Sequence, residues 1–232
     1  LYYRSNNGAT WDSINIGLQG YLNAVHYANG IWMAVGKDEY QENAYTIWTT
    51  NDITSSSSWS NQGEQFFGHD GYGNDVTYGG ETGSEMWIVV GQTSNGNNLI
   101  YKIGDNQWIS TRVSNDELTS VHYNDVDKWS LLSKSDSRDT YDIYTSCDGI
   151  NWESSGQNKY WGFKGYATDI YQDDTFWVIV GRPEGNFSGN NLYYSTDNGA
   201  SWTARNIGLY GYLNAIHHDG NRIWMAVGKD EY

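Results

Sequence analysis

The sequence predicts an all-β protein, a five-bladed β-propeller made of four-stranded antiparallel blades. Three observations predict this fold: an apolar run around a tryptophan occurs five times, aromatic residues and glycine are abundant, and the repeats have the length of propeller blades. Equivalent tryptophans are spaced by roughly 40 to 55 residues, which suits a unit of four short strands. No segment has a helical periodicity long enough to predict a helix.

The composition supports strands joined by turns. The 232 residues include 27 glycines, 20 tyrosines and 12 tryptophans, but only one proline. Aromatic and β-branched residues between clusters of Gly, Asn, Asp and Ser are typical of strands and turns. The chain is therefore expected to consist of many short strands.

The repeated apolar run is the second strand of each blade. Near-continuous apolar runs this short are typical of strands that are buried on both faces. The five runs are residues 31–36, 86–91, 128–133, 176–181 and 223–228. Because a single blade cannot cover both of its faces, neighbouring blades must pack against them. The tryptophans are accordingly expected in the core rather than in a ligand site.

Three further strands complete the repeat. A shorter strand precedes each apolar run, at 23–26, 74–77, 119–122, 168–171 and 214–217. A third strand follows, at 1–3, 46–48, 99–101, 142–144 and 192–194. A polar turn then leads to a second tryptophan on the fourth strand: Trp11, Trp59, Trp108, Trp152 and Trp202. We name the four strands A to D, with A innermost.

The strands divide residues 1–232 into one propeller domain. Complete blades are expected near 21–62, 72–113, 117–155 and 166–206. A C–D pair at 1–18 and an A–B pair at 212–232 remain, and together they would form the closing blade and remove exposed sheet edges. The two ends of the chain are similar, and residues 35–40 and 227–232 both read Val-Gly-Lys-Asp-Glu-Tyr. Self-association through the ends, as one period of a longer array, is the alternative.

The turn before the second tryptophan carries a family resemblance. Residues 195–202, Ser-Thr-Asp-Asn-Gly-Ala-Ser-Trp, resemble the Asp-box pattern S-x-D-x-G-x-x-W of sialidases, sortilin-type receptors and many secreted propellers, and degenerate copies precede the other four tryptophans. The carboxylate can accept hydrogen bonds from its own turn, and glycine allows a positive φ. The resemblance implies a folding device away from the ligand face, in a non-catalytic secreted protein.

Charge and cysteine content exclude several classes of function. The formal net charge is −15, which repels nucleic-acid phosphates and anionic lipids. No apolar stretch approaches the roughly 18 residues that span a bilayer. The chain has one cysteine, so an intrachain disulfide is excluded. Neither a nucleic-acid partner nor membrane insertion is expected.

Candidate binding residues recur where strand A begins. Each blade has a tyrosine or acid there, followed by a polar residue: Tyr21, Asn23, Tyr72, Asn74, Glu117, Thr119, Tyr166, Thr168, Tyr212 and Asn214. In a closed propeller these side chains would ring the mouth of the channel. Aromatic faces stack on sugars, and amides and hydroxyls pair with sugar hydroxyls. The pattern predicts glycan binding, and the alternative is that the residues only line a water-filled channel.

The long loops between strands B and C are expected on the same face. Asn186 begins the one Asn-x-Ser/Thr sequon, so it is a candidate glycosylation site. This fits an extracellular or surface-exposed protein. Acidic residues in these loops could hold Ca²⁺, but no ligand spacing resembles a known loop, so no cofactor is expected.

The residues do not point to a sialidase. That chemistry needs three converging arginines, and only Arg138 and Arg182 are expected on the binding face. A paired-carboxylate glycosidase is harder to exclude, because Asp75 and Asp169 occupy equivalent positions on two blades. His26, His122 and His217 also recur at one position, where they are expected to face the channel rather than bind a metal.

We therefore predict a non-catalytic extracellular propeller that binds a glycan or a protein surface, or that serves a structural role. A structural repeat of a filament, virion fibre or cell-surface array is the alternative. A glycoside hydrolase or sialidase-like enzyme is the second alternative.

Overall fold

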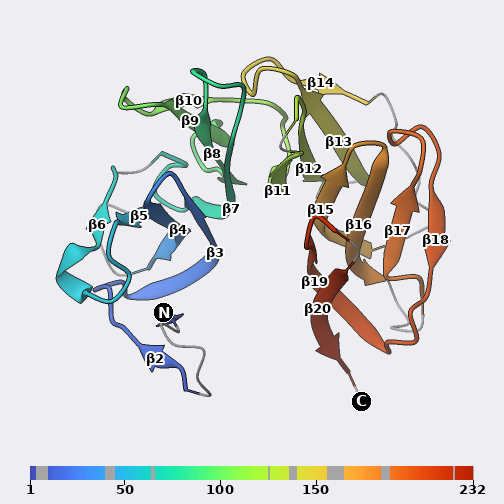
Figure 1. The fold of residues 1–232 in the computed structure, drawn as a ribbon, viewed down its shortest axis with the longest axis horizontal. Coiled ribbons are helices and arrows are strands. Elements are labelled where there is room, and N and C mark those ends of the chain that lie inside the picture. The colour runs from blue at the N-terminus through green and yellow to red at the C-terminus, as the bar shows by residue number, and fades with distance from the viewer. Residues whose placement is uncertain are drawn as a thin grey trace.

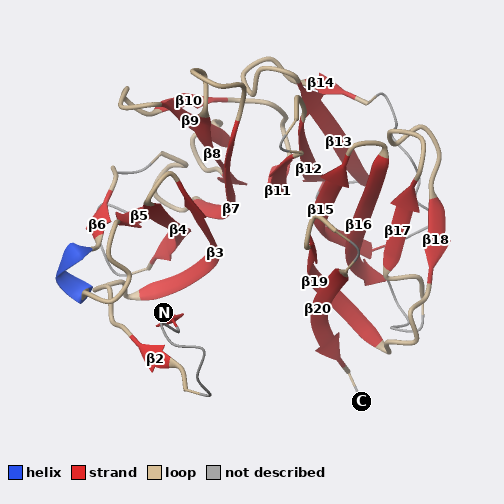
Figure 2. Ribbon diagram, in the orientation of Figure 1, coloured by secondary structure: helices blue, strands red, loops and turns tan. Residues whose placement is uncertain are grey.

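The computed structural model is an open arc of antiparallel β-sheets arranged around a central channel (Figure 1). It describes residues 1–3, 10–39, 45–63, 66–124, 126–135, 140–155, 165–183, 189–221 and 223–231. Its helical content there is one 3₁₀ turn, η1 (Ser56–Ser58), drawn in Figure 2. Nothing helical in the described ranges is long or apolar enough to cross a membrane.

Four sheets have four strands each, and their strands are adjacent in chain order. Blade 1 contains β3 (Gly20–Ala28), β4 (Ile31–Asp38), β5 (Ile47–Thr50) and β6 (Ser60–Asn61). Blade 2 contains β7 (Tyr72–Gly79), β8 (Met86–Gln92), β9 (Leu99–Ile103) and β10 (Ile109–Thr111). Blade 3 contains β11 (Glu117–Tyr123), β12 (Trp129–Ser135), β13 (Thr140–Ser146) and β14 (Glu153–Ser154). Blade 4 contains β15 (Gly165–Asp173), β16 (Phe176–Pro183), β17 (Leu192–Ser195) and β18 (Thr203–Arg205).

The fifth blade is divided between the two ends of the chain. The C–D pair is β1 (Tyr2–Tyr3) with β2 (Asp12–Ser13), and the A–B pair is β19 (Gly211–His218) with β20 (Trp224–Asp230). The predicted all-β fold, with five blades and a split fifth blade, is confirmed. In this structure the two halves form separate two-stranded sheets, and Figure 1 shows them apart.

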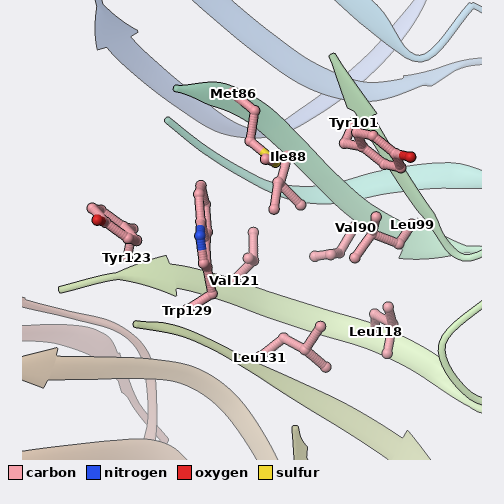
Figure 3. Packing of buried hydrophobic residues seen from close by; sticks show 10 residues of the cluster. All are labelled: Met86, Ile88, Val90, Leu99, Tyr101, Leu118, Val121, Tyr123, Trp129 and Leu131. Atoms are coloured by element: carbon pink, nitrogen blue, oxygen red, sulfur yellow. The ribbon is translucent and has the colours of Figure 1, made fainter. Parts of the chain in front are cut away.

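The core lies between blades, as the unbroken apolar runs predict. In Figure 3, Met86, Ile88 and Val90 of β8 point toward blade 3, where they meet Trp129 and Leu131 of β12. The alternate residues of β8 pack instead with Met33 and Val35 of blade 1. Strand B is thus buried on both faces, and Trp129 is fully buried.

The turns between strands C and D are closed by their own side chains. In blade 3, Gly149 N–H donates to Ser146 Oγ at 2.8 Å, and Asn151 N–H donates to Asp148 Oδ1 at 2.8 Å. The indole N–H of Trp152 donates to Gly149 O at 3.1 Å. The hydrogen bond from Asn151 N–H, with others from this turn, lowers the pKa of Asp148. The turn at 195–202 of blade 4 has the same arrangement.

Separation of the two half-sheets leaves apolar side chains uncovered. Met225 and Val227 of β20 are 63% and 53% exposed, whereas Met33 and Val35 at the equivalent positions of β4 are 2% and 0% exposed. Val25 of β3 is likewise exposed, although its counterpart on each other blade is buried. These side chains are of the type that a blade-to-blade contact covers elsewhere in the ring.

Candidate functional site

The channel is lined by strand A of all five blades and is open between blade 1 and the β19–β20 pair (Figure 1). A cavity of about 360 Å³ is lined by one Val or Ile from each of these strands: Val25, Val76, Val121, Ile170 and Ile216. The strand order within each sheet places strand A innermost, as predicted. Side chains that begin or end strand A are therefore brought to the two mouths of one channel.

A β-bulge interrupts strand A at the same position in every blade. The pairing of strands A and B shifts by one residue at Asn23, Asn74, Thr119, Thr168 and Asn214. The bulge explains the glycine that ends most apolar runs, because a Cβ on Gly91 would overlap the carbonyl oxygen of Tyr72. Bulges redirect side chains, and here they turn the polar residue toward the next blade.

Three of the five bulged residues donate a hydrogen bond to a backbone carbonyl of the next blade. Asn23 Nδ2 donates to Gly73 O at 2.8 Å, and Asn74 Nδ2 donates to Leu118 O at 2.9 Å. Thr168 Oγ1 donates to Leu213 O at 2.7 Å. The fourth, Thr119 Oγ1, is buried without a hydrogen-bond partner in the described ranges, and the fifth, Asn214, is exposed. Asn23 and Thr168 are thus engaged in joining blades.

One mouth of the channel brings together several of the predicted binding residues. The rings of Tyr21 and Tyr72 meet edge to face with centroids 6.2 Å apart. Glu117 accepts hydrogen bonds from Tyr72 OH at 3.3 Å and from Asn74 Nδ2 at 2.8 Å, and Lys134 Nζ lies 3.6 Å from its other oxygen. Tyr21 is 39% exposed. We call Tyr21, Tyr72, Asn74, Glu117 and Lys134 the mouth cluster.

The electrostatics of the mouth cluster follow from its carboxylate. Partial burial raises the pKa of Tyr21, and the charges of Glu39 and Glu117 raise it further. The Tyr21 phenol therefore stays protonated and able to donate a hydrogen bond. Lys134 was not singled out from the sequence, because its approach to Glu117 depends on the pairing of β11 with β12.

The remaining predicted residues lie outside this cluster. Tyr212 lies under Arg182, whose guanidinium carbon is 5.5 Å from the ring centroid. Tyr166 belongs to β15, but its side chain is outside the described part of the structure. Asn186 and Arg138 also fall outside the described ranges.

Deeper in the channel, two carboxyl groups lie on either side of one hydroxyl. Ser120 Oγ is 3.0 Å from Asp75 Oδ2 and 2.6 Å from Asp169 Oδ1. A hydroxyl has one hydrogen to donate, so both contacts are full hydrogen bonds when one of the carboxyls is protonated. Asp75 also accepts Val121 N–H at 2.9 Å, and Asp169 accepts Ile216 N–H at 2.8 Å.

The pKa values of Asp75 and Asp169 are raised, as expected if one of the two carboxyls keeps its proton. Burial raises the pKa of Asp75 to about 6, and burial together with the charge of Asp75 raises the pKa of Asp169 to about 7. The sequence repeat identified Asp75 and Asp169 as equivalent. It also places Ser120 at the same position of blade 3, but the bridging role of this serine appears only when the three blades are side by side.

Histidines surround the far end of the channel. His26, His122 and His217 line the same cavity as the carboxyl groups. Burial lowers the pKa of His122 to about 3, with smaller contributions from the other two histidines. Its Nδ1 accepts the N–H of Gln172 at 3.3 Å. Among the described residues, no three His, Cys, Asp or Glu side chains are placed to hold a metal ion.

Comparison with known proteins supports the fold. No protein-family model and no curated protein matches the sequence. Among solved structures, YCF48 bound to a D1 peptide has a TM-score of 0.57 and 15% identity, over 97% of this chain and 68% of that one. A GH43 β-1,3-galactosidase has a TM-score of 0.56 and 13% identity, over 88% of this chain, which spans 52% of the galactosidase. A second GH43 β-1,3-galactosidase, solved with galactodeoxynojirimycin, has a TM-score of 0.55 and 10% identity, over 89% of this chain and 90% of that chain.

These structures contradict the prediction that the chain is not an enzyme. At this identity the likeness shows the propeller fold alone, and glycoside hydrolases have that fold. The prediction relied on missing arginines, which are a requirement of sialidases only. Most glycoside hydrolases use a pair of carboxyl groups that flank the scissile bond.

Proposed function

We propose that the mouth cluster binds a glycan. The observation that carries this proposal is the placement of two partly exposed tyrosine rings beside a carboxylate, an amide and an ammonium group. Aromatic rings stack on the C–H faces of sugars, while Glu117 and Lys134 can accept from and donate to hydroxyl groups. The proposal includes an extracellular or surface location, and the Ser-x-Asp turns support a relationship to secreted Asp-box propellers.

A glycan array tests this proposal. We expect wild-type protein to bind a defined subset of glycans, and Tyr21→Ala with Tyr72→Ala to weaken binding at least about tenfold, because stacking area is lost. Tyr27→Ala is the matched control, since Tyr27 is an exposed tyrosine at the opposite end of the same strand. Absence of binding by wild type, or equal loss in the control, would refute glycan recognition at this mouth.

Hydrolysis of the bound glycan is a second candidate, favoured by the carboxyl pair below the mouth. One protonated and one ionised carboxyl supply the acid and the base that glycoside cleavage requires. The panel for this test consists of aryl glycosides and β-1,3-linked galactan, with Asp75→Asn and Asp169→Asn as variants. We expect each variant to lose at least about a hundredfold in rate while retaining glycan binding. If wild type cleaves nothing in the panel, this candidate is rejected and the binding proposal is unaffected.

A further inference from the structure

The two halves of the fifth blade carry complementary surfaces that do not meet in this structure. Val227 of β20 is 53% exposed, whereas Val35, at the same position of β4, is fully buried. Val35 packs on strand A of the next blade, where a Cβ built on Gly73 would be 3.0 Å from Val35 Cβ. Leu22 of blade 1 has the position of Gly73, just before the bulge. Leu22 is therefore the residue on which Val227 would pack if β20 lay beside blade 1.

A cavity of about 420 Å³ lies beside Leu22. Its apolar lining comes from the C–D half of the fifth blade and from the connection to blade 1: Leu1, Ile14, Ile16, Leu18 and Leu22. The same side chains pack on blade 1, so β1 and β2 already have their place there. In blade 1, Val35 forms one cluster with Ile47, the strand C counterpart of Leu1. The cavity thus has the position and the apolar character of a seat for Val227.

The fifth bulged residue lacks the contact that three others make. In blades 1, 2 and 4 the bulged residue donates to the carbonyl just before the bulge of the next blade: Asn23 to Gly73, Asn74 to Leu118 and Thr168 to Leu213. Asn214 of the fifth blade is exposed. By the same rule its acceptor is Leu22 O of blade 1. The hydrogen bond and the apolar contact therefore indicate the same place for β19 and β20.

The free edges of β20 and β1 also match in register. Among the described strands, β20 pairs only with β19, and β1 pairs only with β2. In blade 4, Val178 of strand B is opposite Tyr194 of strand C. Met225 is the counterpart of Val178, and residues 1–3 repeat the Leu-Tyr-Tyr of β17. A completed fifth blade would thus place Met225 opposite Tyr3.

We propose that a glycan bound at the mouth cluster closes the ring, bringing β20 beside β1 and Val227 into the cavity. The inference rests on the proposed function, and the free protein is open, as in this structure. A ligand shifts such an equilibrium only through contacts that it gains in the favoured state. Here it gains Tyr212, because closure puts this ring beside Tyr21 as Tyr21 lies beside Tyr72, with centroids 6.2 Å apart. Arg182, over the ring of Tyr212, is brought to the glycan with it.

Cysteine cross-linking tests closure without a glycan. Cys147→Ser removes the one native cysteine. In that background, Tyr3→Cys with Met225→Cys places two thiols at directly opposed positions of an antiparallel pair, within the Cα separation that a disulfide spans. We expect mild oxidation to form an intramolecular disulfide, because it traps the closed ring. The disulfide is detected as the loss of two thiols at the mass of the monomer.

Tyr2→Cys with Met225→Cys is the matched control, because successive side chains of a strand point to opposite faces. We expect the control to form at least about tenfold less of the intramolecular disulfide. Absence of the disulfide from the Tyr3 variant, or equal formation in the control, overturns closure. A disulfide that joins two chains would identify a second copy as the neighbour of β20 and would also overturn it.

The same cross-linked protein tests the coupling between closure and glycan binding. On the array used for the mouth cluster, we expect the oxidised protein to bind at least about tenfold more tightly than after reduction, since the glycan no longer has to close the ring. Equal affinities overturn the coupling. If neither form binds any glycan, the proposed function fails together with the coupling, while the cross-link still decides whether the ring closes.

Met225→Ala tests the coupling at a residue remote from the mouth. Met225 is opposite His217, near the end of strand B that lies away from the mouth cluster. We expect this variant to bind glycans at least about tenfold more weakly, because the closed ring buries Met225 as it buries Met33. Ile109→Ala is the matched control, since Ile109 is an exposed apolar residue of blade 2. Equal binding by Met225→Ala and wild type would overturn the proposal.

Discussion

At the scale of single residues, the carboxyl pair of the channel is the least ordinary chemistry in the molecule. Asp75 and Asp169 each accept a backbone N–H from the next blade. Ser120 of blade 3 contacts both carboxyls, so the pair and this serine join blades 2 to 5. Burial raises both pKa values. The pair therefore links blades and also retains a proton near neutral pH. Its contribution to the stability of the fold depends on pH for that reason.

The raised pKa values predict a specific dependence of stability on pH. A carboxyl whose pKa is higher in the folded than in the unfolded chain stabilises the fold at low pH, and this contribution is lost as pH rises through the folded value. For Asp75 and Asp169 the loss extends from about pH 4 to about pH 7. We expect the melting temperature of Asp169→Asn to change less between pH 5 and pH 8 than that of wild type.

The comparison between the two proteins isolates the carboxyl pair. His122, whose pKa is lowered, stabilises the fold increasingly as pH rises from about 3 to about 6.5, but it is present in both proteins. The absolute melting temperature of the variant is expected to fall, because Ser120 and Ile216 donate to different oxygens of Asp169 and an amide has only one oxygen. An unchanged pH dependence in the variant would show that the pair is ionised throughout this range.

At the scale of the element, strand A is defined by its bulge. In three blades the bulge places one polar side chain against the backbone of the next blade. The sequence repeat shows the bulged residue as Asn or Thr in every blade. The hydrogen bond replaces contacts that water makes in the unfolded chain, so its net contribution is about 1 kcal/mol.

Asn23 and Asn214 provide a matched test of this contribution. Both occupy the bulge of a Tyr-Leu-Asn-Ala segment, but Asn23 donates to Gly73 O and Asn214 is exposed. We expect Asn23→Ala to lower the free energy of unfolding by about 1–2 kcal/mol, and Asn214→Ala to change it by less than about 0.5 kcal/mol. Chemical denaturation measures both values, and equal effects would contradict the role of the bulged residue.

At the scale of the whole molecule, the fifth blade differs from the other four. Its two halves are complementary in strand type, yet they are separate sheets in this structure. The outer face of β20 consequently exposes apolar side chains that strand B buries in the complete blades. The energetic cost of that exposure is measurable, because β4 has nearly the same sequence and is covered.

Met33 and Met225 are the residues to compare. They occupy the same position of strand B and are 2% and 63% exposed. We expect Met33→Ala to cost about 2–5 kcal/mol and Met225→Ala less than about 0.5 kcal/mol, measured by denaturant unfolding of dilute protein. A large cost for Met225→Ala would show that β20 is covered in solution, and dependence of that cost on protein concentration would identify the cover as a second copy.

Much of this fold could be predicted from the sequence because the signals are local and repeated. Apolar runs around Trp32, Trp87, Trp129, Trp177 and Trp224 define strand B, and glycine-rich turns separate the strands. The mouth residues Tyr21, Tyr72 and Glu117 were also predicted to meet, since equivalent positions of a propeller converge on its axis. Residues at equivalent positions of the sequence repeat are therefore close together in the folded protein.

The sequence alone determined the blade type and the blade count, because strand period and repeat length are properties of the chain. Tertiary structure decided which polar groups are already satisfied: Asn23 holds the next blade, Ser120 bridges two carboxyls, and the Trp108 indole lacks an acceptor. These outcomes depend on differences of a few tenths of an ångström in the distances between blades that are far apart in sequence. Such distances are set by packing, and packing is not encoded in any single repeat.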